Sequence, residues 1–159
     1  PYIKKAYPDV ERGTGIKFGE PFLQNILEPG TAVFSSELPG IAMTVFRQHK
    51  PEQVLAFAHA LQNALYRDGI ELSVLENYAP LAEQFGLPSA AFLEAMQTEE
   101  NRYETLTEFQ TVSNWGINGF PTVLIKPSND EQYYMIARGY TPYERLDTVI
   151  GKVLPELAG

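Results

Sequence analysis

Cysteine is absent from the 159-residue sequence. This absence excludes disulfide bonds, a thiolate nucleophile and any metal site built on cysteine ligands. The chain also lacks an apolar run near the roughly 20 residues that span a bilayer, and no basic segment followed by an apolar one opens it. We therefore predict a soluble chain without a membrane segment. It begins at Pro1 rather than methionine, so processing or truncation stays open.

Basic residues are few, because 12 Lys and Arg stand against 20 Asp and Glu. The net charge is −8 and the pI is near 4.7. Nucleic-acid-binding proteins carry clustered basic residues that replace the counterions of the phosphate backbone, and the sequence has no such cluster. We therefore expect no nucleic-acid partner. The length fits one domain that buries about two thirds of the surface of its unfolded chain.

Helical spacing of apolar residues dominates the first three quarters of the chain. Helices are predicted over Pro21–Leu27, Glu37–His49, Pro51–Asp68, Ser73–Phe85, Ser89–Met96 and Thr98–Trp115. Between Tyr2 and Arg12, Pro8 and the following glycines predict short helical turns at most. The aromatic residues predicted to face the core are Phe57, Phe85, Phe92, Tyr103 and Phe109.

The pattern changes from helix to strand after Gly119. Thr122–Lys126 and Tyr133–Arg138 are predicted strands of a β-hairpin, and the turn formers of Pro127–Asp130 join them. A last helix is predicted after Pro142, with Thr141 as its cap. A hairpin alone is marginally stable in water, and the only other candidate strands, at 16–18 and 33–34, are short. The sheet is therefore predicted to be incomplete, with an open edge that could form a homo-oligomer.

The loop in front of the hairpin is the strongest candidate site. Pro121 stands at the first position of a strand, where its missing N–H is tolerated. Phe120 precedes it, and an X–Pro bond is one of the few that can be cis. Trp115 lies at the edge of this loop in the sequence and could line a cleft.

Three segments carry a family resemblance. Gly116–Val123, with the hairpin and helix that follow, resembles the second half of a thioredoxin fold. Phe57–Tyr66 and Ala137–Tyr140 are similar to segments of the DsbA-like group, in its FrnE-like dithiol-disulfide isomerase branch. The resemblance implies an α/β, thioredoxin-like fold that is mostly helical. Residues 1–112 would form a helical insertion subdomain, and residues 113–159 the C-terminal half of the thioredoxin-like domain.

The chain departs from this family at its start. Family members begin with a strand, a Cys-X-X-Cys pair at a helix N-terminus, that helix and a second strand, and no segment of this sequence corresponds to them. We therefore expect a chain whose N-terminal β-α-β portion is missing. The resemblance then implies no catalytic residue in this chain, no cofactor and no metal. It leaves Gly119, Phe120 and Pro121 as a cis-proline loop that positions protein or peptide thiols and disulfides.

Three functions remain open at this point. The first is a thiol-disulfide oxidoreductase or isomerase, present here without its dithiol. The second is a kappa-type glutathione transferase or 2-hydroxychromene-2-carboxylate isomerase, which resembles the same scaffold. Cys-X-X-Cys upstream of Pro1 would support the first, and a lone serine the second. The third is a non-catalytic peptide-binding module. We expect a cytoplasmic location, or a periplasmic one if a signal peptide has been removed.

Overall fold

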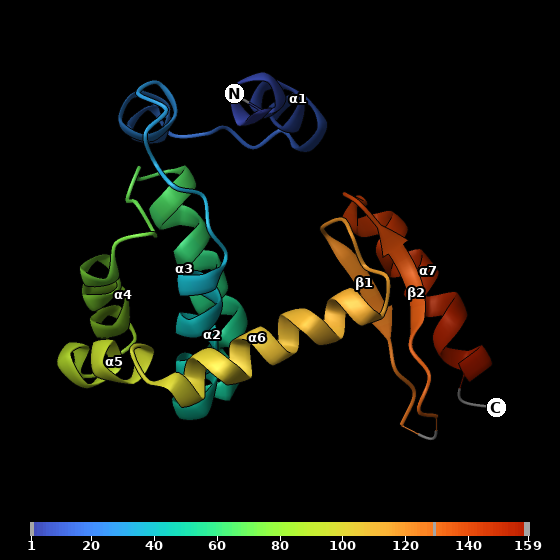
Figure 1. Ribbon diagram of the computed structural model, residues 1–159. Coiled ribbons are helices and arrows are strands. Elements are labelled where there is room, and N and C mark those ends of the chain that lie inside the picture. Colours follow the sequence, from blue (N-terminus) through green and yellow to red (C-terminus); the bar gives the residue numbers. More distant parts are fainter. Residues whose placement is uncertain (1, 129, 158–159) are drawn as a thin grey trace. The chain divides into compact units, whose positions relative to one another are not determined.

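The computed structural model describes residues 2–128 and 130–157. The chain forms two compact units, Pro1–Glu108 and Phe109–Gly159 (Figure 1). The helices of the first unit are α1 (Tyr2–Thr14), π-helical η1 (Phe22–Leu27), α2 (Glu37–His49), 3₁₀-helical η2 (Pro51–Gln53), α3 (Val54–Tyr66), η3 (Leu75–Tyr78), α4 (Ala79–Gln84) and α5 (Ser89–Met96). Helix α6 (Glu99–Asn114) begins in this unit. The predicted functional division at 112/113 stays a prediction.

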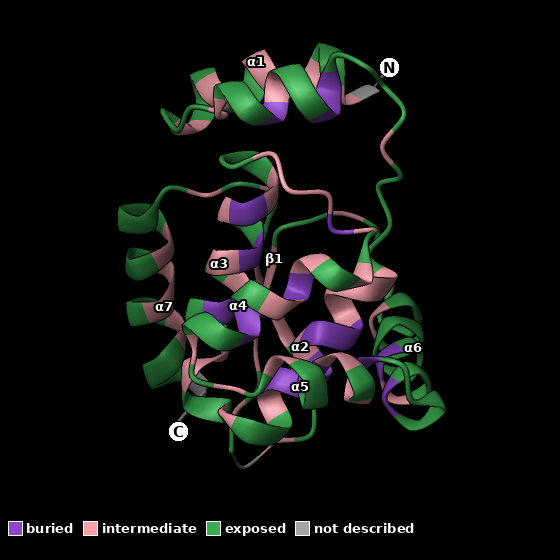
Figure 2. Cartoon of the chain, turned by 90° about the vertical axis from the view of Figure 1, so that its left-hand side faces the viewer, coloured by how far each residue is buried: buried purple, intermediate pink, exposed green. Residues whose placement is uncertain are grey.

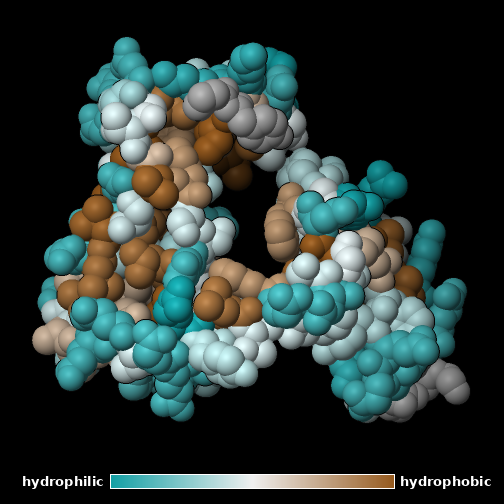
Figure 3. Space-filling model, viewed as in Figure 1, coloured by the Kyte–Doolittle hydropathy of each residue, from teal (hydrophilic) through white to brown (hydrophobic). Residues whose placement is uncertain are grey.

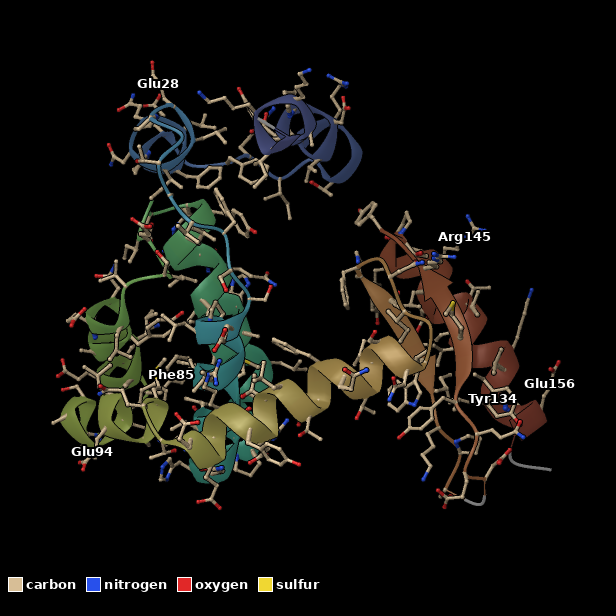
Figure 4. All side chains as sticks on the ribbon, viewed as in Figure 1. Glu28, Phe85, Glu94, Tyr134, Arg145 and Glu156 are labelled. Carbon is tan, nitrogen blue, oxygen red and sulfur yellow. The ribbon has the colours of Figure 1, made fainter. Side chains whose placement is uncertain are left out.

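The main core of the first unit lies between α2, α3, α4 and α5, where Figure 2 shows most of the buried residues. Phe46 and Phe57 are fully buried, and their rings stack at 4.1 Å with an interplanar angle of 5°. Phe85 meets both rings edge-on and points toward α2 (Figure 4). Phe92 meets Phe57 in the same way. The predictions that Phe57 and Phe92 are core residues are therefore confirmed.

A second, smaller cluster corrects the prediction for the N-terminal segment. Residues 2–14 form a 13-residue helix, α1, that continues through Pro8. Proline removes one hydrogen bond from a helix, but its fixed φ is compatible with helical backbone. Ile3 and Tyr7 of α1 pack against the cluster that contains the buried Phe22. This tertiary packing outweighs the local signal on which the prediction of short turns was based.

Helix α6 packs with the face opposite to the one predicted. Tyr103 is 74% exposed and Phe109 is 40% exposed, so neither is a core residue. Asn101 and Thr105 are buried instead. They face α2 through side-chain hydrogen bonds, in which Gln48 Nε2 donates to Asn101 Oδ1 at 2.8 Å. A pattern of apolar residues cannot identify a helix face that packs through polar contacts.

The Thr44–Thr105 pair at this helix contact gives a testable prediction. Both residues are 1% exposed, and their hydroxyl oxygens lie 2.9 Å apart. The Thr105 hydroxyl donates to the Asn101 carbonyl at 2.8 Å, so Thr44 is the donor within the pair. Thr105→Val leaves the buried Thr44 hydroxyl without this acceptor and should lower the free energy of unfolding by about 2 kcal/mol.

A double-mutant cycle checks this assignment. Thr44→Val combined with Thr105→Val removes both hydroxyls and keeps the side-chain shapes, so the double variant should lose clearly less stability than the two single changes added together. Urea denaturation followed by circular dichroism measures the four free energies. Strict additivity would contradict a hydrogen-bonded pair.

The second unit contains strands β1 (Thr122–Ile125) and β2 (Tyr134–Arg138) and helix α7 (Tyr143–Leu157), which packs beside β2 (Figure 1). The strands are antiparallel, as predicted, and a bulge interrupts the register between Val123 and Leu124. Within the described ranges the sheet has these two strands, and residues 16–18 and 33–34 are not strands. None of the described side chains of this unit is buried.

The start of α7 differs from the prediction. The Thr141 hydroxyl donates to the Gly139 carbonyl at 3.3 Å and does not cap the helix. The carbonyl of Pro142 accepts the N–H groups of Arg145 and Leu146 at 3.1 and 3.0 Å, so the helix begins after the proline.

The first unit also exposes apolar side chains to solvent. Figure 3 shows hydrophobic side chains over α4 and the neighbouring part of α3 on the face in view. Leu55 of α3 is 86% exposed.

Candidate functional site

The candidate loop begins where α6 ends. Gly116 has a φ of +72°, in the left-handed region that favours glycine. Its N–H donates to the Ser113 carbonyl at 2.9 Å, and the N–H of Ile117 donates to the Val112 carbonyl at 3.3 Å. These two bonds are those of a Schellman motif, which satisfies the last carbonyls of a helix. The glycine therefore ends α6 and turns the chain into the loop.

The loop joins the hairpin at Pro121. The Phe120–Pro121 bond is cis, which confirms the geometry implied by the resemblance. The Pro121 carbonyl accepts the N–H of Gly139 at 2.7 Å, so the contact between the two strands extends one residue beyond β1. The Thr122 hydroxyl donates to the Gly119 carbonyl at 2.7 Å and closes the loop on itself. Gly119, Phe120 and Pro121 are thus held as one short, ordered segment.

Phe120 is the most exposed large residue of this segment, with 78% of its surface accessible. Within the described residues, no hydrogen bond involves its backbone or side chain. A free backbone N–H and C=O at the end of a strand can pair with an added extended chain. The loop therefore offers both an aromatic surface and unpaired backbone groups.

Sequence reasoning missed two residues that hold the loop. The Arg138 guanidinium donates to the Asn118 side-chain oxygen and so links the end of β2 to the loop. Arg138 pairs with Thr122 in the register, next to the Gly139–Pro121 contact. The resemblance had placed Arg138 in a family-like segment but gave it no role. No local sequence signal identifies this pair, because it depends on the strand register.

Trp115 takes part in an aromatic pair. Its ring centroid lies 4.4 Å from that of Tyr133, with an interplanar angle of 35°. Trp115 is 44% exposed and Tyr133 is 46% exposed. The pair joins the end of α6 to the residue before β2. Trp115 is therefore a half-exposed contact of the hairpin, and its predicted place in a cleft stays a prediction.

A tyrosine–carboxylate hydrogen bond lies at the turn end of the hairpin, where Figure 4 shows Tyr134. The Tyr134 hydroxyl donates to Asp130 Oδ2 at 2.6 Å, and the Gln132 N–H donates to Asp130 Oδ1 at 2.9 Å. The bond from Tyr134, and secondly the bond from Gln132, lower the pKa of Asp130 below its ordinary value of 3.8. The same contact raises the pKa of Tyr134.

These bonds predict how the turn responds to acid. A carboxyl group with a lowered folded pKa stabilises the fold fully above its unfolded pKa, and the contribution is lost as the pH falls through the folded pKa. We expect the carboxyl of Asp130 to titrate below pH 3.8 in an NMR pH titration. Tyr134→Phe should raise that midpoint, whereas Tyr133→Phe should not. An unchanged midpoint in Tyr134→Phe would contradict the assignment.

The described ranges hold no group of three or more His, Asp or Glu side chains that could bind a metal ion. None of the helices described is long and apolar enough to cross a membrane. The sequence contains no thiol. At the loop itself, the exposed groups are the aromatic ring and the backbone of Phe120.

Comparisons with known proteins place the fold. Neither a protein-family model nor a curated protein sequence matches the chain. The solved structure of a candidate protein disulfide isomerase from Nitrosomonas europaea is similar to this chain, with a TM-score of 0.86 and 29% sequence identity. The match covers 98% of this chain and 73% of the chain of that protein. This likeness supports the DsbA-like thioredoxin-fold family that the sequence resembles. The mostly helical, thioredoxin-like α/β fold predicted from the sequence is thereby confirmed.

Two further matches of this DsbA-like chain show the same fold at lower identity. One is the cytosolic disulfide reductase DsbM from Pseudomonas aeruginosa, with a TM-score of 0.75 and 21% sequence identity. The match covers 99% of this chain and 76% of the DsbM chain. The other is the structure of DsbM with glutathione, with a TM-score of 0.70 and 20% sequence identity. The match covers 96% of this chain and 73% of the DsbM chain.

Proposed function

We propose that this DsbA-like chain serves thiol-disulfide exchange on proteins or peptides, and that residues 113–159 hold the substrate in place. The observation that carries the proposal is Phe120, which is exposed, makes no hydrogen bond within the described residues and lies two residues before strand β1. Gly119, Phe120 and Pro121 would bind an extended substrate by strand-like pairing. Residues 1–112 are assigned as the helical insertion.

The chemistry of exchange sets what this chain can contribute. A thiolate attacks one sulfur of a disulfide, the other sulfur leaves as a thiolate, and a second thiol resolves the mixed disulfide. The 159 residues contain no cysteine, so the attacking thiolate is supplied from outside them. The role assigned to this chain is orientation of the substrate sulfur.

Glutathione is the small thiol to test first, because DsbM was solved with it. The same neighbour is cytosolic, and we assign a cytoplasmic location on that basis. A kappa-type glutathione transferase remains the second candidate, since it would also use glutathione. Pairing of two copies at the open sheet edge stays a prediction.

The experiment is an NMR titration of the full chain with a five-residue extended peptide that carries a central S-methylated cysteine. We expect amide shifts at residues 118–122 and at Gly139. Gly119→Ala should weaken binding about tenfold, or about 1.4 kcal/mol, because a methyl group blocks close approach of a second backbone. Glutathione titrated in parallel tests the small-thiol alternative.

The control uses the space around each glycine. A Cβ atom at Gly119 would meet no other atom within 4 Å, so Gly119→Ala should leave the fold intact. The same is true at Gly151 on α7, and Gly151→Ala should leave peptide binding unchanged. Shifts confined to other parts of the chain, or equal affinities for both variants, would overturn the proposed role of the loop.

A further inference from the structure

The first unit contains a cavity of about 340 Å³ that the loop chemistry does not use. All of the residues that line it fall within Pro1–Glu108. Its apolar wall includes Ile26, Leu61 and Leu72, which are 5%, 5% and 7% exposed. Cavities of roughly 300–1,000 Å³ with a few placed polar groups are typical of small-molecule sites.

Glu71 is the only charged residue among those that line the cavity in the described part of the chain. No lysine, arginine or histidine accompanies it there, and none of the ion pairs found among the described residues includes it. The Ser73 hydroxyl donates to Glu71 Oε1 at 2.6 Å and fixes the carboxylate. Glu71 is partly buried, and a carboxylate beside an apolar wall favours a cationic ligand, because the two form a charge-assisted pair.

The segment that presents Glu71 is braced by its neighbours. The Asn77 side chain donates to the Glu71 carbonyl at 2.7 Å, and the hydroxyl of the buried Tyr78 donates to the Leu72 carbonyl at 2.7 Å. Ile70 N–H donates to the Ala64 carbonyl of α3 at 2.8 Å. Fixed polar groups bind with a smaller entropy cost than mobile ones.

Aromatic rings form part of the cavity lining. Phe34 is 46% exposed and Tyr66 is 39% exposed, and both line the cavity. Each ring packs edge-on against the buried Phe22, with centroid distances of 6.5 and 5.4 Å. Aromatic faces attract ammonium groups. The carboxylate and the aromatic rings therefore favour the same ligand charge.

We propose that this cavity binds a small organic cation with an apolar body, such as an arylalkyl amine. The apolar wall takes the hydrocarbon part, Glu71 pairs with the ammonium group, and Phe34 and Tyr66 cover it. No residue of this site belongs to the loop at Pro121, so the two proposals can fail independently.

Three probes of similar size test the charge preference: phenylbutylamine, phenylbutanol and phenylbutyrate. Isothermal titration calorimetry at pH 7 on the full chain should find the amine bound about tenfold more tightly than the alcohol, and the carboxylate most weakly. Glu71→Gln should reduce amine affinity to that of the alcohol and leave alcohol affinity unchanged. Equal affinities for all three probes, or no binding at millimolar concentration, would overturn the proposal.

Two further variants locate the site. Glu76→Gln removes an exposed carboxylate of the same segment that does not line the cavity, and it should leave amine affinity unchanged. Ala58→Phe adds a ring at a residue that lines the cavity and should abolish binding of the amine and the alcohol. Circular dichroism shows whether each variant keeps its helices. A folded Ala58→Phe variant that still binds the amine would place the ligand elsewhere.

Discussion

Replacement of Phe57 by alanine should lower the free energy of unfolding by about 4 kcal/mol. Its side chain is fully buried and stacks on Phe46 at 4.1 Å, with Phe85 and Phe92 edge-on around the pair. Removal of the ring loses its transfer free energy and leaves a cavity that neighbouring aromatic rings cannot fill without leaving their own contacts. Urea denaturation followed by far-ultraviolet circular dichroism measures the change.

Leu55 provides a control on the same helix. It is also a large apolar residue of α3, but 86% of its surface is exposed. Leu55→Ala should change stability by no more than about 0.5 kcal/mol, because no packed contact is lost. Similar losses for the two variants would mean that the stacked aromatic cluster is not the core of the unit.

Replacement of Gly19 by alanine should lower stability by about 3 kcal/mol, at the upper end of the cost of overpacking. The added Cβ would lie 2.6 Å from the Arg67 carbonyl carbon and closer still to its oxygen. These are backbone atoms, which cannot rotate away. The Gly19 N–H donates to the Tyr66 carbonyl at 2.9 Å, so the change also disturbs this bond to the end of α3.

Gly13→Ala is the matched control. A Cβ atom at Gly13 would meet no other atom within 4 Å, and the residue lies in α1. Alanine is a better helix former than glycine, so stability should be unchanged or higher by up to about 1 kcal/mol. Thermal unfolding of both variants gives the comparison. A stable Gly19→Ala variant would show that the contact with Arg67 can relax.

Most of the secondary structure could be predicted from local signals. Pro51 marks the start of η2 and α3, Gly116 marks the end of α6, and the turn formers of 127–130 separate the two strands. Two features could not be predicted, because packing decides them. Contacts of Ile3 and Tyr7 keep α1 helical through Pro8, and polar contacts orient α6 through Thr105 rather than Tyr103.

In the candidate site, too, the local features could be predicted from the sequence and the long-range contacts could not. A proline before an apolar run, with a glycine nearby, is a local pattern, and it led to Gly119, Phe120 and Pro121. The partners that hold this loop are not local, since Arg138 lies 20 residues from Asn118 and reaches it through the strand register. Glu71 carried no sequence signal, because the residues that line the cavity with it come from segments that are distant in the chain.

The lack of a buried side chain among the described residues of the second unit has a calorimetric consequence. The heat capacity change of unfolding arises mainly from apolar surface that becomes hydrated. The unit holds about a third of the chain, yet it removes little apolar surface from water within itself. It should therefore contribute much less than a third of the total heat capacity change. The stability of the hairpin by itself would then vary little with temperature, whereas that of the aromatic core would follow a strongly curved profile.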